Sequence, residues 1–121
     1  MPKILVIDDD EFMLSALTDY LVSGGFIVTK TTDGPQGIEL YTKVKPAAVI
    51  LDLGLPSMDG LQVLKRIREK DENAKVVVLT GYPSKAAERA AHAMGAAEFL
   101  SKPIESKLLL ATLDAVLAIP S

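Results

Sequence analysis

The stretch KILVIDDDEFM, residues 3–13, sets an apolar run directly before three consecutive carboxylates. The run from Lys3 to Ile7 has no alternation of polar and apolar residues, which is typical of a strand covered on both faces. Asp8, Asp9 and Asp10 follow it at once. Because like charges at the end of a buried segment repel one another, this order of residues raises the question of which cation balances them.

The bulk composition limits the class of protein. The chain has 121 residues, 49% of them hydrophobic, which is enough for one domain with a single core. A net charge of -3 argues against direct binding of nucleic acid or a membrane surface. The absence of cysteine excludes disulfides, thiolate metal sites and cysteine nucleophiles. With no signal peptide and no membrane-length apolar run, a soluble cytoplasmic protein is expected.

Short apolar runs alternate with helix-length segments along the chain. The expected strands are Lys3–Ile7, Phe26–Lys30, Ala47–Leu51, Lys75–Leu79 and Ala97–Leu100. The helices between them are delimited by Gly24-Gly25, Asp33-Gly34-Pro35, Asp59-Gly60, Pro83 and Gly95, and the last spans about Ile104 to Leu117. Five strand-then-helix units predict an α/β fold, a parallel sheet with helices on both faces. Ligands of such sheets bind beyond the carboxyl ends of the strands.

Polar side chains follow four of the five expected strands, and only residues 31–33 resemble a plain loop. These side chains are Asp8, Asp9 and Asp10 after the first strand, Asp52 after the third, Thr80 after the fourth and Lys102 after the fifth. Each of these residues also has an ordinary structural interpretation, such as a helix cap, a loop residue or a solvated charge. For Asp10 we prefer the ordinary interpretation, as a helix cap. The convergence of the others on one edge of the sheet predicts a site there.

The residue types at this edge suit phosphoryl transfer assisted by a metal ion. Oxygen ligands without a neighbouring His or Cys favour Mg²⁺ over Zn²⁺. A carboxylate can attack phosphorus and form an acyl phosphate, while the protein aligns the groups and offsets charge on the phosphoryl oxygens. We therefore interpret Asp8 and Asp9 as the metal cage and Asp52 as the nucleophile. Lys102 and Thr80 would bind the phosphoryl oxygens.

These residues match the pattern of a known family. Over essentially its whole length it resembles the receiver domain of bacterial two-component response regulators. The matching features are Asp8-Asp9 after an ILVI strand, LDLGLPSMDG around Asp52, Thr80-Gly81 and Lys102-Pro103. The resemblance implies a doubly wound (βα)5 fold with a five-stranded parallel sheet in the order 2-1-3-4-5. It also implies that residues 1–121 form a single receiver domain, with no output domain in this chain.

The resemblance further implies a signalling phosphoacceptor rather than an enzyme. Asp52 would accept a phosphoryl group from the phosphohistidine of a sensor histidine kinase or a histidine phosphotransfer protein. Mg²⁺, with Mn²⁺ as a substitute, would be held by Asp8, Asp9, Asp52 and the backbone carbonyl of Gly54. The Lys102-Pro103 peptide bond would be cis, an isomer that X-Pro bonds tolerate far better than others.

The switch and the partner surface are implied in the same way. Thr80 and Phe99 would change conformation together when Asp52 is phosphorylated. Partners would bind the face made by the fourth helix, fifth strand and fifth helix. The fifth helix has more apolar residues than one buried stripe needs, which favours a homodimer or an output partner there. Those residues are Leu108, Leu109, Leu110, Leu113, Val116 and Leu117.

Two positions are expected to set the lifetime of the acyl phosphate. Gly54 has no side chain to orient a water molecule, and Tyr82 could cover the phosphoryl group. We therefore expect slow to moderate hydrolysis. The single histidine, His92, lies among alanines and is interpreted as a surface residue.

Two other functions compete with this interpretation. A phosphatase of the haloacid dehalogenase type could use Asp8, since Asp8-x-Asp10 imitates its nucleophile motif. However, no acidic pair follows Lys102, and the segment around Asp52 would be unexplained. A flavodoxin-like flavin carrier has a similar topology, but its phosphate-binding loop would be replaced here by DDDE, which repels phosphate.

Overall fold

The computed structural model describes residues 1–120, so Ser121, the last residue of the expected domain, lies outside it. Within that range the strands are β1 (Lys3–Ile7), β2 (Ile27–Thr31), β3 (Ala48–Leu51), β4 (Val76–Thr80) and β5 (Glu98–Ser101). The helices are α1 (Glu11–Ser23), α2 (Gly34–Val44), α3 (Gly60–Lys70), α4 (Lys85–Ala93) and α5 (Ser106–Leu117). Strands and helices alternate as predicted, and the observed strand ends differ from the predicted ones by one residue at most.

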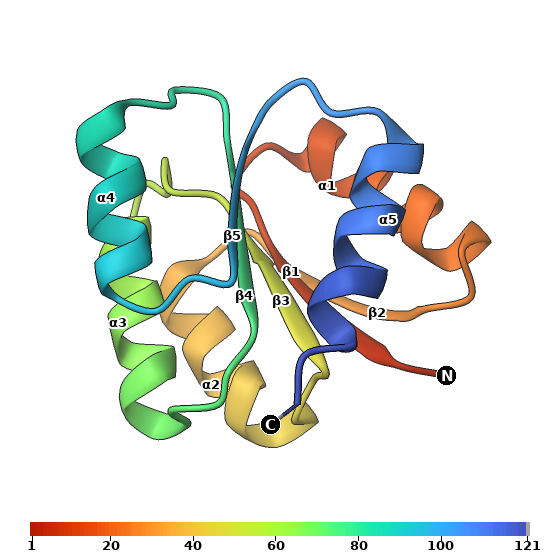
Figure 1. Cartoon of the computed structure of the whole chain (residues 1–121), viewed down its shortest axis with the longest axis horizontal. Helices are drawn as coiled ribbons and strands as arrows, with labels where there is room; N and C mark the ends of the chain where they lie inside the picture. Colours follow the sequence, from red (N-terminus) through yellow and green to blue (C-terminus); the bar gives the residue numbers. More distant parts are fainter. Residues whose placement is uncertain (121) are drawn as a thin grey trace.

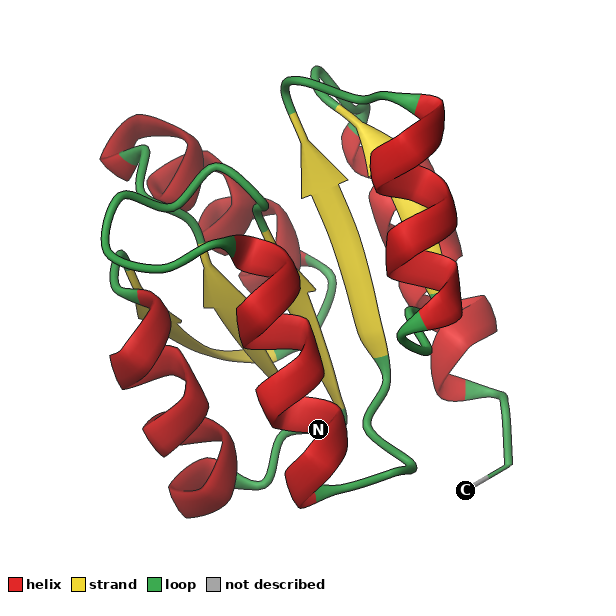
Figure 2. Cartoon of the chain, turned by 90° about the vertical axis from the view of Figure 1, so that its left-hand side faces the viewer, coloured by secondary structure: helices red, strands yellow, loops and turns green. Residues whose placement is uncertain are grey.

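All strands of the sheet run parallel, in the order β2-β1-β3-β4-β5. This is the predicted doubly wound arrangement. The register aligns the strand ends, since Ile7 lies beside both Thr31 and Leu51. Figure 2 shows the arrowheads of the strands pointing the same way, toward a common set of loops. The loops after β1 and β3 therefore meet where the strand order changes direction, the usual ligand position in such sheets.

Two apolar cores flank the sheet. Helices α1 and α5 cover one face, and α2, α3 and α4 cover the other (Figure 1). Along β1, Ile4 and Val6 belong to the core beneath α1 and α5, whereas Leu5 and Ile7 belong to the opposite core. All four side chains are fully buried. This double burial explains why the first apolar run shows no alternation.

Aspartates begin three of the helices. Asp10 accepts hydrogen bonds from the amides of Phe12 and Met13 at 3.0 and 3.2 Å, which confirms its prediction as a cap of α1. Asp33 accepts from the amide of Gln36 at the start of α2. Asp59 does the same for α3. Each carboxylate satisfies free N–H groups of a first turn and favours the positive end of the helix dipole.

One predicted helix face needs correction, and the excess of apolar residues predicted for the last helix is confirmed. The spacing of Leu61, Leu64 and Ile67 predicts that these three residues form the buried face of α3, but Leu61 is half-buried, and Val63 takes its place in the core. Gly60 faces the sheet, and Val63 follows it at the three-residue spacing of one helix face. In α5 only Leu109, Leu113 and Val116 are fully buried.

Candidate functional site

Three of the predicted polar side chains, Asp8, Asp52 and Lys102, meet beyond the carboxyl ends of the strands, and Thr80 ends the neighbouring strand β4. Asp8, Asp52 and Thr80 are buried, with exposed fractions of 2%, 7% and 2%. The Nζ atom of Lys102 lies 2.8 Å from Oδ2 of Asp8 and 3.3 Å from Oδ2 of Asp52. The ammonium thus bridges two carboxylates that directly follow two different strands, β1 and β3.

The sheet itself positions these side chains, because its ladder of hydrogen bonds continues one residue past the strands. The amide of Asp8 donates to the carbonyl of Thr31, and the amide of Asp52 donates to that of Ile7. Likewise, between β4 and β5, the amide of Lys102 donates to the carbonyl of Thr80 at 2.8 Å. The backbone at these positions is therefore held as firmly as in the strands.

Three carboxylates form a group that could hold a metal ion. Asp8, Asp9 and Asp52 each offer one oxygen, and these oxygens all lie within 4.8 Å of one another. Asp9 is exposed and opens the group to solvent. Hard oxygen donors with one open side suit Mg²⁺, which keeps several of its waters. Gly54 lies on the exposed rim, and its amide donates to Oδ1 of Asp52 at 3.2 Å.

The crowding of charge changes the proton affinity of these groups. Burial raises the pKa of Asp8, and the charge of Asp52 adds to the effect, although Lys102 opposes it. Burial and the charge of Asp52 also raise the pKa of Asp9. Burial alone would lower the pKa of Lys102, but its bonds to Asp8 and Asp52 outweigh burial and leave that pKa raised. A divalent cation would relieve the repulsion among the carboxylates.

The other predicted residues lie in β4, β5 and the segments that follow these strands. The hydroxyl oxygen of Thr80 accepts a hydrogen bond from the amide of Tyr82, whose side chain is 91% exposed. Phe99, in β5, is half-buried and packs against the core beneath α2, α3 and α4. The Lys102-Pro103 peptide bond is cis. His92 is exposed on α4 and lies outside this group of residues.

The sequence analysis missed one contact beside the site. The sequence predicts a plain loop at residues 31–33, yet Oδ1 of Asp33 accepts a hydrogen bond from Oγ of Ser57 at 2.8 Å. Ser57 belongs to the loop that carries Asp52 and Gly54. The cap signal at Asp33 was visible in the sequence, but nothing in the sequence indicated that its second oxygen meets a residue 24 positions away.

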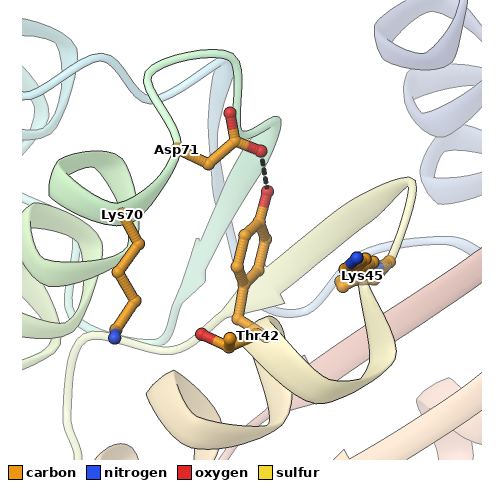
Figure 3. A pocket seen from close by; sticks show the side chains of 6 residues that line it. Thr42, Lys45, Lys70 and Asp71 are labelled. Carbon is orange, nitrogen blue, oxygen red and sulfur yellow. Dashed lines mark hydrogen bonds between the residues drawn. The ribbon is translucent and has the colours of Figure 1, made fainter.

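A cavity of about 570 Å³ lies at the opposite, amino-terminal edge of the sheet (Figure 3). It is lined by Tyr41, Thr42, Lys45, Pro46, Lys70 and Asp71. The hydroxyl of Tyr41 donates to Oδ2 of Asp71 at 2.8 Å. None of the predicted site residues lines this cavity, so the two edges of the sheet carry separate polar groups.

Comparison with known proteins supports one family. The family model described as response regulator receiver domain matches residues 4–114. The chain is 34% identical over 118 residues to the chemotaxis protein CheY of Treponema pallidum, covering 95% of this chain and 82% of that protein. It is 31% identical over 103 residues to sporulation initiation phosphotransferase F of Bacillus subtilis, covering 85% and 83%.

Solved structures agree with these relatives. The crystal structure of a response regulator receiver domain protein from Clostridium thermocellum superposes with a TM-score of 0.92 at 27% identity. That match covers 97% of this chain and 94% of the other. Within residues 1–120, no helix has the length and apolar character needed to cross a membrane.

Proposed function

The chain belongs to the response regulator receiver domain family of two-component systems, and on this premise we propose that it is a phosphorylation-activated signalling switch. Asp52 accepts a phosphoryl group from the phosphohistidine of a sensor histidine kinase or a histidine phosphotransfer protein. The observation that carries the proposal is the position of the Lys102 ammonium, which contacts buried Asp8 and Asp52 beside the exposed carboxylate of Asp9.

In the proposed reaction, a carboxylate oxygen of Asp52 attacks phosphorus, the N–P bond of phosphohistidine breaks, and the imidazole leaves with the bonding electrons and takes up a proton. Lys102 is held more closely by Asp8, at 2.8 Å, than by Asp52, at 3.3 Å. Asp8 can therefore anchor the ammonium while its contact with Asp52 is exchanged for a phosphoryl oxygen. The hydroxyl of Thr80 is free to donate a hydrogen bond to another phosphoryl oxygen.

Asp8, Asp9, Asp52 and the backbone carbonyl of Gly54 would hold Mg²⁺, with Mn²⁺ as a substitute. Bound there, the ion would neutralise charge on the phosphoryl oxygens. Three carboxylates and one ammonium leave a formal charge of −2, which a divalent cation balances. The chemistry of the donor set thus supports the metal assignment.

The signal would leave the site through Thr80 and Phe99 and reach the face made by α4, β5 and α5. A cavity of about 510 Å³ on this face is lined by residues 99–101, residues 103–105 and Leu108. Leu108 is 54% exposed. We assign this face to an output partner or a second copy of the chain, with no direct contact to nucleic acid or membrane, in the cytoplasm.

The phosphoryl group is expected to be lost slowly or at a moderate rate. Gly54 offers no side chain that could orient water, and the amide of Tyr82 is already bonded to Thr80. The exposed ring of Tyr82 could cover the phosphoryl group. Loss of label from the phosphoprotein measures this rate. Decay within seconds, or decay that is unchanged in Tyr82→Ala, would contradict the assignment.

The first experiment is labelling by acetyl phosphate with Mg²⁺, followed by intact mass. A gain of one phosphoryl group that disappears in Asp52→Asn supports the proposal. Asp59→Asn is a matched control, because Asp59 is a carboxylate in the same loop that only caps α3. Persistent labelling of Asp52→Asn would refute the proposed phosphoacceptor.

The same experiment tests the two rivals. Turnover of acetyl phosphate that depends on Asp8 and ignores Asp52 would indicate a phosphatase. Against that function, the carboxylate of Asp10 is engaged with the amides of Phe12 and Met13 as a helix cap. A purified protein with the absorbance of a flavin would indicate a flavin carrier.

A further inference from the structure

The loop between β3 and α3, residues 52–59, is fixed at both of its ends. At the first end, the amide of Gly54 donates to the side chain of Asp52. At the second end, the amide of Gly60 donates to the carbonyl of Leu53 at 3.1 Å. A Cβ atom on Gly60 would lie 2.3 Å from Cα of Leu53, so α3 begins in direct contact with the backbone beside Asp52. Only the middle of the loop is left to be held by other contacts.

The middle of the loop rests on the first turn of α2. A Cβ atom on Gly34 would lie 3.2 Å from Cβ of Met58 and 3.4 Å from Cδ1 of Leu55, so the two segments are in close contact. Beside this apolar contact, Oγ of Ser57 donates to Oδ1 of Asp33 at 2.8 Å. Within residues 1–120, this is the side-chain hydrogen bond that joins the middle of the loop to the loop after β2.

Asp33 is well placed to be a fixed acceptor. Its Oδ2 atom accepts from the amide of Gln36 at 2.8 Å, which leaves Oδ1 for Ser57. Its own amide donates to Oγ1 of Thr31 at 3.1 Å, which ties Asp33 to the end of β2. Asp33 lies at the N-terminus of α2, where the helix dipole favours negative charge, and a hydrogen bond to a charged acceptor is stronger than a neutral one.

We propose that Ser57 is a positioning residue for the phosphoacceptor site and acts through the loop that carries Gly54. This inference rests on the proposed function, in which the Gly54 carbonyl holds the metal ion. Without the bond to Asp33, the middle of the loop would occupy more than one position. The apparent affinity for the cation then falls by the fraction of molecules whose loop is in the binding position.

The test is the affinity of the unphosphorylated protein for Mg²⁺, measured by isothermal titration calorimetry. Ser57→Ala should bind Mg²⁺ about two- to tenfold more weakly, the effect of one hydrogen bond of this kind. Ser57→Thr, which keeps the hydroxyl, should restore most of the affinity. Asp33→Asn should weaken binding in the same direction, because one amide oxygen cannot cap α2 and accept from Ser57 at full strength.

Ser23→Ala is the matched control, since Oγ of Ser23 donates to the carbonyl of Tyr20 at 2.9 Å at the far end of α1. It removes one similar bond and should leave the Mg²⁺ affinity unchanged. An unchanged affinity in both Ser57→Ala and Asp33→Asn, or an equal loss in Ser23→Ala, would overturn the inference. This outcome is distinct from failure of the proposed function, which is read from labelling of Asp52→Asn.

Discussion

The two edges of the sheet both bury polar side chains, but they balance charge differently. At the carboxyl edge, Lys102 contacts two carboxylates, and Asp9 adds a third to the same group. At the amino edge, the neutral hydroxyl of Tyr41 donates to the carboxylate of Asp71, which also accepts from the amide of Asn73 (Figure 3). The amino edge is satisfied by its own hydrogen bonds, whereas the carboxyl edge has an excess of negative charge.

This difference separates a polar contact that is satisfied within the protein from a group of side chains suited to binding a cation. A satisfied polar pair rigidifies the structure, and we assign that role to Tyr41 and Asp71, which join α2 to the end of α3. An excess of like charge costs stability unless a cation relieves it. The carboxyl edge therefore carries a cost in stability that a bound cation would reduce. Changes at the two edges should differ in their dependence on Mg²⁺.

The largest effect is expected for Lys102→Met. Removing the ammonium leaves two buried carboxylates without their partner, which should lower the free energy of unfolding by roughly 3 kcal/mol without Mg²⁺. Saturating Mg²⁺ should reduce this loss, because the cation replaces the missing positive charge. Urea unfolding with and without Mg²⁺ measures both values. Lys43→Met, which breaks an exposed pair with Glu39, should cost less than about 1 kcal/mol in either condition.

The next effect is the stabilisation of the wild-type protein by Mg²⁺. At one hundred times its dissociation constant, a ligand that binds only the folded state adds about 2.7 kcal/mol to the free energy of unfolding. Asp9→Asn should lose most of this gain, since it removes one donor of the cluster. Asp71→Asn, at the other edge, should keep the full gain. An equal stabilisation of both variants by Mg²⁺ would contradict the proposed difference between the two edges.

A smaller effect is expected for Tyr41→Phe. Loss of the hydrogen bond to Asp71 should lower the free energy of unfolding by about 1–2 kcal/mol, because the acceptor is charged. The loss should be the same with and without Mg²⁺. Chemical denaturation of the two proteins measures it. A loss that grows or shrinks with Mg²⁺ would mean that the two edges are coupled.

The contribution of Tyr41 should also depend on alkaline pH. Burial, and then the hydrogen bond to Asp71, raise the pKa of Tyr41 above its ordinary value of 10.0. Above pH 10 the unfolded chain loses the Tyr41 proton, whereas the folded protein keeps it because its pKa is higher. The contribution of Tyr41 to the free energy of unfolding therefore falls as pH rises through this range. The stability difference between wild type and Tyr41→Phe should be constant below pH 10 and shrink by up to about 1 kcal/mol by pH 11. Unfolding at both pH values provides the measurement.

The smallest expected effect is a change in stability at Lys45, at the amino edge of the sheet. Lys45, which ends α2, has a φ of 52°, in the left-handed region that glycine adopts without strain. Lys45→Gly should therefore raise the melting temperature slightly, for a gain of about 0.5 kcal/mol. Lys43→Gly, inside the last turn of the same helix, should lower stability by about 0.5–1 kcal/mol. The same sign for both variants would contradict the strain at Lys45.

The fold and the centre of the candidate site could be predicted because both follow from strands and their ends. An apolar run marks each buried strand, and a parallel sheet brings the next residues, such as Asp8 and Asp52, to one edge. Contacts between loops could not be predicted. Ser57 and Asp33, like Tyr41 and Asp71, come from different segments and meet only because of the packing of α2. Burial of Val63 in place of Leu61 depended on the rotation of α3.

The bond between Asp8 and Lys102 joins residues that are 94 positions apart, and Lys102 directly follows the last strand of the sheet. This ion pair can therefore form only after the last strand, β5, has been synthesised. A chain that ends before Lys102 therefore lacks the ion pairs that offset the negative charge of Asp8 and Asp52.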